Sequence, residues 1–209
     1  MPLFKTFQSN DYRGGIWKTD ESLEELNALL PDPVMYREDL LNLKTPSRRL
    51  ERLAVRVLLY ELLGNQKLVL YEDSGAPYLQ DKSFTISISH TAGYVAAIVG
   101  KSAIIGIDIE RFGEKVHKVS KKFMREDEIA SFYKQVDTWS LLLHWSAKET
   151  LFKALGCEGV DFREHLFISP FQVRESGEFI AQEFRTTLNR KFTINYIINQ
   201  DFVLTWTYL

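Results

Sequence analysis

The sequence predicts an α+β protein built as two halves of similar size. Its 209 residues are 45% hydrophobic, enough for one large core or two small ones. Apolar residues at helical spacing are followed by short alternating apolar runs, and this order occurs twice along the chain. We therefore predict an N-terminal domain over residues 1–103 and a C-terminal domain over residues 104–209.

Turn residues mark the elements of the first half. Apolar residues recur at helical spacing after Pro46, and Gly64 ends that stripe. Ser89-His90-Thr91 is expected to interrupt an alternating run. The predicted elements are a helix over 21–30 capped by Thr19 or Asp20, a helix from Pro46 to Gly64, and strands over 68–71, 84–88 and 94–99.

The second half begins with an apolar, strand-like run and closes in β-branched and aromatic residues. Between them, periodicity predicts two helices, and Gly156 ends the second one. The predicted elements are a strand over 104–109, helices over 116–133 and 139–155, and a meander of strands from about 166 to 209.

Composition and charge narrow the classes of function. The formal net charge of -2 argues against a nucleic-acid-binding protein, which usually has a basic excess. Cys157 is the single cysteine, so no intramolecular disulfide is expected, and the four histidines lack the spacing of a zinc site. The pattern shows neither a signal peptide nor a membrane-spanning run, so we expect a cytoplasmic protein that does not bind membranes.

Two short segments place acidic residues where a cation could bind. Asp108 and Glu110 lie two residues apart in a strand-like run and are expected on one face, where they repel each other unless a cation lies between them. Glu149 and Lys153 lie one helical turn apart. Three carboxylates suit Mg²⁺, and a lysine suits a phosphate. The alternatives are a solvated acidic face and an exposed Glu149–Lys153 ion pair.

Basic residues are regularly spaced as well. Arg48, Arg52 and Arg56 recur every four residues and could clamp phosphates or form a solvated face. A second basic run at helical spacing could dock an acidic partner or could simply be solvated. Its members are Lys118, Lys121, Lys122 and Arg125.

Four motifs follow one another in a specific order. They are Gly75-Ala76-Pro77-Tyr78, Ile86-Ser87-Ile88-Ser89-His90-Thr91, Gly106-Ile107-Asp108-Ile109-Glu110 and Trp145-Ser146-Ala147-Lys148-Glu149-Thr150-Leu151-Phe152-Lys153. This set resembles the 4'-phosphopantetheinyl transferase superfamily, and most of all its Sfp-like group. The arginine-bearing helix over 48–56 also matches in position. The resemblance implies a monomer whose two similar α+β subdomains form a pseudodimer.

The family transfers the phosphopantetheine arm of coenzyme A to a serine of an acyl or peptidyl carrier protein and releases 3',5'-ADP. The resemblance therefore implies Mg²⁺ as cofactor, coenzyme A as co-substrate and an apo-carrier protein as partner. The first domain would contact the coenzyme A phosphates, and the second would hold the metal. The resemblance assigns metal binding to Asp108, Glu110 and Glu149, catalysis to Glu149, Lys153 and Lys148, and coenzyme A binding to Arg48, Arg52, Ser89, His90 and Lys153. Glu128 matches a position where some members keep another acid.

The chain departs from the family pattern at one turn. Ala76 stands where related chains often have lysine or arginine, so a phosphate contact is missing or is supplied by Arg37 or Arg49. Two other functions compete with the transferase. A Mg²⁺-dependent nucleotidyl transferase or nuclease could use the same carboxylates, but the overall charge does not favour its basic groove. A non-catalytic binding module is the other alternative.

Overall fold

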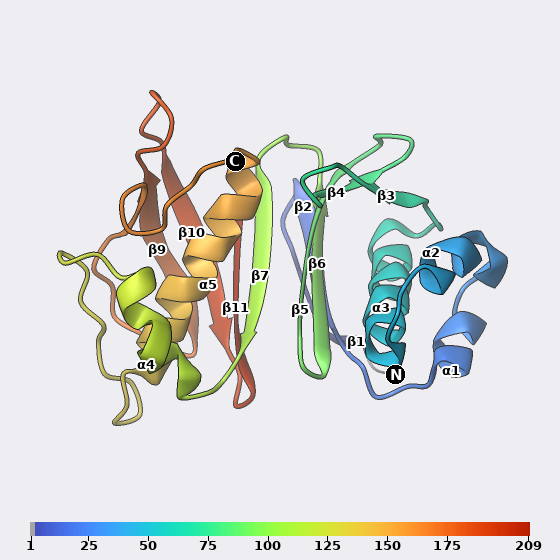
Figure 1. The fold of residues 1–209 in the computed structure, drawn as a ribbon, viewed down its shortest axis with the longest axis horizontal. Coiled ribbons are helices and arrows are strands. Elements are labelled where there is room, and N and C mark those ends of the chain that lie inside the picture. The colour runs from blue at the N-terminus through green and yellow to red at the C-terminus, as the bar shows by residue number, and fades with distance from the viewer. Residues whose placement is uncertain (1–2) are drawn as a thin grey trace. The chain divides into compact units, whose positions relative to one another are not determined.

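The computed structural model describes residues 3–209. Contacts within the chain divide it after Ile105 into two compact units. We call the described residues up to Ile105 unit 1, and Gly106–Leu209 unit 2. Each unit combines helices with a sheet of several strands (Figure 1), so the predicted α+β class with two sheet-containing halves is confirmed. The predicted boundary followed residue 103, and the roles assigned to the two domains stay predictions.

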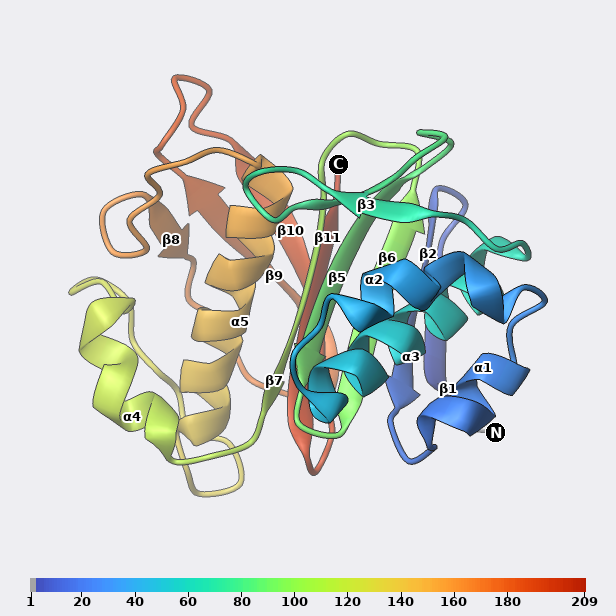
Figure 2. The same ribbon diagram turned by 45° about the vertical axis from the view of Figure 1, so that its right-hand side comes forward.

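Unit 1 packs its long helix α3 on a four-stranded antiparallel sheet of order β1-β2-β6-β5. Leu53 and Leu58 of the helix join Val95 and Ala97 of β6 in the core. Two short helices, α1 and α2, lie beside α3 (Figure 2). The bounds are β1 Leu3–Gln8, β2 Tyr12–Lys18, α1 Leu23–Ala28, η1 Pro33–Tyr36, α2 Arg37–Leu41, α3 Pro46–Leu63, β3 Val69–Tyr71, β4 Pro77–Leu79, β5 Thr85–Thr91 and β6 Tyr94–Gly100.

Unit 2 packs helix α5 on a five-stranded sheet of order β7-β11-β10-β9-β8. Gly106 of β7 lies very close to the helix, because a Cβ atom there would be 2.2 Å from the carbonyl oxygen of Thr150. Buried hydroxyls also join α5 to β11, where Thr150 Oγ1 lies 2.7 Å from Thr205 Oγ1. The bounds are β7 Ile105–Arg111, α4 Lys115–Val119, η2 Ser120–Lys122, α5 Thr138–Leu155, β8 Leu166–Ile168, β9 Ser176–Glu183, β10 Lys191–Ile198 and β11 Phe202–Tyr208.

Both long helices end where glycine was expected to end them. Gly64 follows α3 with φ 72°, and Gly156 follows α5 with φ 57°. Glycine adopts this left-handed conformation without the steric cost of a Cβ atom. At the start of α3, the Thr45 hydroxyl accepts a hydrogen bond from the Arg48 amide at 3.4 Å.

Three details of the predicted elements were wrong. The first helix begins later, after a capping box at Ser22. Strand β5 continues through Ser89-His90-Thr91, and the turn falls at Gly93, where φ is 85°. The helix predicted over 116–133 ends near Lys122. Side chains there compete with the helical backbone bonds, because the Ser120 hydroxyl donates to the His117 carbonyl and the Glu128 carboxylate accepts from the Arg125 amide.

Among the described residues, no helix is both long enough and apolar enough to cross a lipid bilayer.

Candidate active site

Strand β7 and helix α5 bring the predicted acidic residues of unit 2 together with a lysine. Asp108 is 3% exposed. Its Oδ1 accepts a hydrogen bond from Lys153 Nζ at 2.8 Å, and the same ammonium donates to the Ile107 carbonyl at 3.1 Å. Lys153 thus pairs with a strand carboxylate, whereas the sequence had left open an exposed pair with Glu149. The helix and the strand are therefore linked through the site itself.

Burial and mutual repulsion disturb the titration of two glutamates here. Burial, followed by the charge of Asp108, raises the pKa of Glu110 to about 7. The same two causes, in the same order, raise the pKa of Glu149 above its ordinary value. The charge of Glu149 also contributes to the raised pKa of Glu110. The three carboxylates therefore form one electrostatic cluster.

One contact of this cluster could not be read from the sequence. The indole N–H of Trp145, on α5, donates to Glu110 Oε1 on β7 at 2.7 Å. Helical spacing places Trp145 and Glu149 on one face, but periodicity says nothing of which strand residue that face meets. The Trp-Ser-Ala-Lys-Glu motif was the only local signal that the tryptophan belonged to the site.

The donor chemistry of the cluster fits Mg²⁺. Within residues 3–209, no three His, Cys, Asp or Glu side chains are arranged to hold a metal ion. Lys153 engages Asp108, and Trp145 engages Glu110. Carboxylate oxygens are nevertheless the donors that Mg²⁺ prefers, and a bound cation would relieve the repulsion that raises the glutamate pKa values. Asp108, Glu110 and Glu149 are the residues that would hold it.

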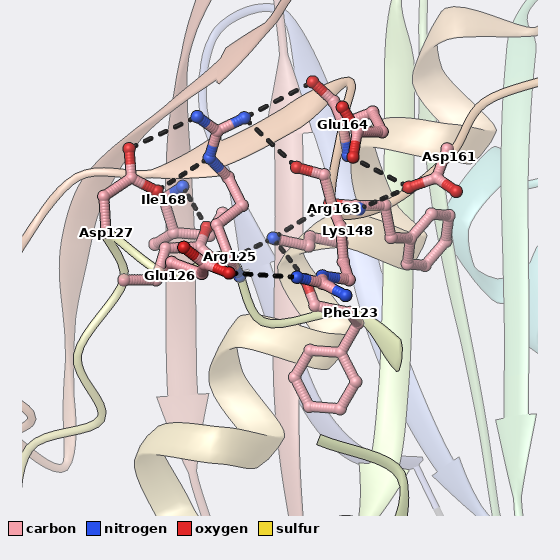
Figure 3. A network of polar contacts seen from close by, with 11 residues as sticks. Phe123, Arg125, Glu126, Asp127, Lys148, Asp161, Arg163, Glu164 and Ile168 are labelled. Atoms are coloured by element: carbon pink, nitrogen blue, oxygen red, sulfur yellow. Dashed lines mark hydrogen bonds and ion pairs between the residues drawn. The ribbon is translucent and has the colours of Figure 1, made fainter. Parts of the chain in front are cut away.

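Lys148, to which the resemblance assigned a catalytic role, makes buried contacts away from the carboxylates of the cluster, and its catalytic role stays a prediction. Its ammonium is fully buried and donates to Glu128 Oε2 at 2.7 Å, to the Phe123 carbonyl at 2.7 Å and to the Phe162 carbonyl at 3.0 Å. Figure 3 shows these contacts between α5 and the neighbouring loops. All three N–H donors are used, and burial lowers the pKa of the ammonium. This placement favours a structural role.

Unit 1 contains a pocket of about 470 Å³. Arg48 and Arg52 reach it from α3, and His90 reaches it from β5. Ser89 does not line the pocket, because neighbouring residues of a strand point to opposite faces and β5 continues through this position. The structure therefore brings three of the four coenzyme A candidates of unit 1 to one pocket. The lining residues are Leu43, Arg48, Glu51, Arg52, Val55, Tyr71, Gly75, Pro77, Ile88 and His90.

Two basic side chains of this pocket, Arg52 and His90, already contact acidic or aromatic groups. Arg52 Nη1 lies 3.3 Å from Asp39 Oδ1, and its guanidinium lies 4.3 Å from the centre of the Tyr71 ring. His90 Nε2 lies 3.5 Å from Glu51 Oε2. Asp39 and Tyr71 were not singled out from the sequence, where nothing distinguishes them from ordinary surface residues. They now define how the Arg52 side chain is held.

The arginine stripe on α3 is divided by burial. Arg56 is fully buried, and its Nη2 donates to Asp39 Oδ2 at 2.7 Å.

The two arginines proposed to replace a cation at Ala76 do not line this pocket. Arg37 and Arg49 line a second pocket, and Arg49 donates to the Leu43 carbonyl at 2.9 Å.

Residues 104–207 match the family model of the 4'-phosphopantetheinyl transferase superfamily. The chain contains a domain of that superfamily. The superfamily domain includes Asp108, Glu110, Glu149 and Lys153, and it implies a transferase. The pocket of unit 1 lies outside the matched residues. No curated protein matches the chain.

Proposed function

We propose that the chain is a 4'-phosphopantetheinyl transferase that modifies a serine of an apo acyl or peptidyl carrier protein. One observation carries the proposal. Within a domain of this superfamily, Asp108, Glu110 and Glu149 share one electrostatic cluster, and Lys153 is bonded to it. A cluster of carboxylates and a lysine is suited to a reaction at a pyrophosphate.

In the proposed reaction, the serine oxygen forms a bond to the β-phosphorus of coenzyme A. The bond from that phosphorus to the bridging oxygen breaks, and 3',5'-ADP leaves. Glu149 is the general base that accepts the serine proton. Lys153 places positive charge, or a proton, on the leaving phosphate. Bound Mg²⁺ would supply charge neutralisation at the pyrophosphate, held by Asp108, Glu110 and Glu149.

Unit 1 would contribute affinity for coenzyme A. The basic side chains Arg48, Arg52 and His90 of the pocket suit its phosphate groups, since guanidinium groups bind phosphates through paired hydrogen bonds. Arg52 would exchange its contact with Asp39 for a contact with phosphate. A role for Ser89 in the same pocket has no geometric support.

We further propose that the chain belongs to the Sfp-like, pseudodimeric group. Helices α3 and α5 each have 18 residues and end at a left-handed glycine. Arg56 comes ten positions after Pro46, the first residue of α3, and Lys148 comes ten positions after Thr138, the first residue of α5. Both side chains are fully buried cations. This correspondence supports two related halves.

The deciding experiment mixes purified protein, apo-carrier, coenzyme A and Mg²⁺ and weighs the carrier by mass spectrometry. We expect the carrier to gain the mass of phosphopantetheine. Asp108→Asn should reduce the rate at least about a hundredfold while leaving the melting temperature near that of the parent. Asp127→Asn, an exposed acid of the same unit, is the matched control. A folded protein that modifies no acyl or peptidyl carrier would contradict the proposal.

A further inference from the structure

The indole N–H of Trp145 links helix α5 to a carboxylate of the cluster. It donates to Glu110 Oε1 at 2.7 Å, and this bond joins the helix to strand β7. A carboxylate held at one oxygen presents its other oxygen in a fixed direction. The tryptophan itself carries no charge and offers no metal ligand. Its contribution to the site is therefore orientation.

Two phenylalanine rings pack against Trp145. The centre of its ring lies 5.2 Å from that of Phe123 and 5.5 Å from that of Phe162. Phe162 in turn lies 6.1 Å from Phe152. Rings at such separations attract each other beyond their burial in water. The two phenylalanines come from different loops, so the position of Trp145 depends on how these loops are fixed.

A buried ion pair fixes both loops. Lys148 Nζ donates to the backbone carbonyls of the two phenylalanines that flank Trp145, at 2.7 Å for Phe123 and 3.0 Å for Phe162. Its third donor meets Glu128 Oε2 at 2.7 Å. Glu128 also accepts from the Ile168 amide at 2.7 Å, which anchors the pair to β8. The loops are thus tied to the helix and to the sheet at one point (Figure 3).

We propose that Trp145 is a positioning residue for Glu110, held by Phe123 and Phe162 and, through their backbones, by the Lys148–Glu128 pair. The inference rests on the proposed function, because it takes Glu110 to be a ligand of the divalent cation. It assigns Lys148 a task one step removed from the reacting atoms. Hydrogen-bond partners of metal-ligating side chains typically change metal affinity by about 10–100-fold when they are removed.

The test is Trp145→Phe, which keeps an aromatic ring against Phe123 and Phe162 and removes the N–H donor. Trp139→Phe is the matched control, because it is the same substitution on the same helix at a residue that packs on Phe112, with ring centres 4.2 Å apart. Binding of Mn²⁺ to the protein with coenzyme A, followed by the relaxation of water protons, measures the site without any turnover. We expect the dissociation constant for Mn²⁺ to rise about tenfold in Trp145→Phe and to change less than twofold in the control.

A second variant protects the test against misfolding. Phe162→Leu leaves the indole N–H in place and loosens one side of its support, so we expect a smaller rise, about threefold, in the same dissociation constant. Equal Mn²⁺ affinity in the parent, Trp145→Phe and Phe162→Leu would overturn the positioning role and leave the proposed function standing. A parent protein that binds no Mn²⁺ in the presence of coenzyme A would overturn both.

Discussion

The two long helices bury a cation at corresponding positions and satisfy it to different degrees. Lys148 of α5 donates all three of its hydrogen bonds, and its partner Glu128 has a fully buried side chain. Arg56 of α3 bonds Asp39, whose side chain is 29% exposed, while its Nε and Nη1 atoms have no hydrogen-bond partner among residues 3–209. A buried charge with every donor engaged fixes the segments around it, whereas a partly satisfied one leaves its surroundings free to adjust. Around its buried cation, unit 2 is therefore more rigidly specified than unit 1.

The largest effect expected from this difference is that of Lys148→Met. The substitution leaves the Glu128 carboxylate buried without its cation, which should lower the free energy of unfolding by about 3–5 kcal/mol. Arg56→Met should cost about 1–2 kcal/mol, since Asp39 remains partly hydrated and keeps Arg52. Urea unfolding measures both. Adding Glu128→Gln to Lys148→Met should recover part of the loss, and equal losses in the two single variants would break the comparison.

The next largest difference is expected in the stability cost of replacing the glycines that face the two helices. A Cβ atom at Gly106 would lie 2.2 Å from a backbone oxygen of α5, whereas one at Gly15 would lie 3.0 Å from the Leu58 side chain of α3. A side chain can turn away, but the backbone of a packed helix cannot. We expect Gly106→Ala to cost about 2–3 kcal/mol and Gly15→Ala about 1 kcal/mol or less. Thermal unfolding of the two variants side by side tests this.

The stability of the metal-free protein should depend on pH through unit 2. The folded state raises the pKa of Glu110 from 4.5 to about 7, so between these values the unfolded chain loses the proton first. The stabilising contribution is present below pH 4.5 and is lost as the pH rises through 7. At pH 8, Glu110→Gln should be more stable than the parent by on the order of 2 kcal/mol. Thermal unfolding in the presence of a chelator at several pH values measures this. The same dependence of melting temperature on pH in the parent and in Glu110→Gln would contradict it.

The smallest expected effects are on the Michaelis constants, and they should differ between coenzyme A and the carrier protein. Arg52→Gln in unit 1 should raise the Michaelis constant for coenzyme A several-fold, because one phosphate contact is worth about 1 kcal/mol. Lys121 and Lys122 are exposed in unit 2, and the double variant Lys121→Glu, Lys122→Glu should instead raise the Michaelis constant for the carrier. Steady-state kinetics with each substrate varied in turn gives both constants. Equal changes in both constants would reject the docking role of the lysines.

Much of the fold could be predicted because local patterns and tertiary packing agree. The stripe after Pro46 and the left-handed glycines at 64 and 156 specify two helices without further information. The helix expected over 116–133 failed because side chains there bond the backbone. The Ser120 hydroxyl donates to a backbone carbonyl, and the Glu128 carboxylate accepts from a backbone amide. Such local competition between side chains and the backbone is not encoded in the apolar periodicity that predicted the helix.

The candidate site was predicted as residues rather than as contacts. Spacing placed Asp108 beside Glu110 and Glu149 beside Lys153, but the pair that forms joins Lys153 to Asp108. The burial of Lys148 against Glu128 was equally unreadable, because a loop and the first half of α5 lie between the two residues in the sequence. Pairings between elements depend on how a helix is placed over a strand. That placement is set here by features such as the close approach at Gly106.

Lys153 has a single ammonium group, and Asp108 holds it in the resting protein. On the proposed function, a cation bound by Asp108 would take over the neutralisation of that carboxylate and release the lysine for a phosphate. A phosphate on the lysine would, in return, leave the carboxylate available to the cation. Each of the two ligands thereby prepares the site for the other. Linkage makes such an effect reciprocal, so Mg²⁺ and coenzyme A should bind cooperatively, with a coupling free energy of about 1–3 kcal/mol.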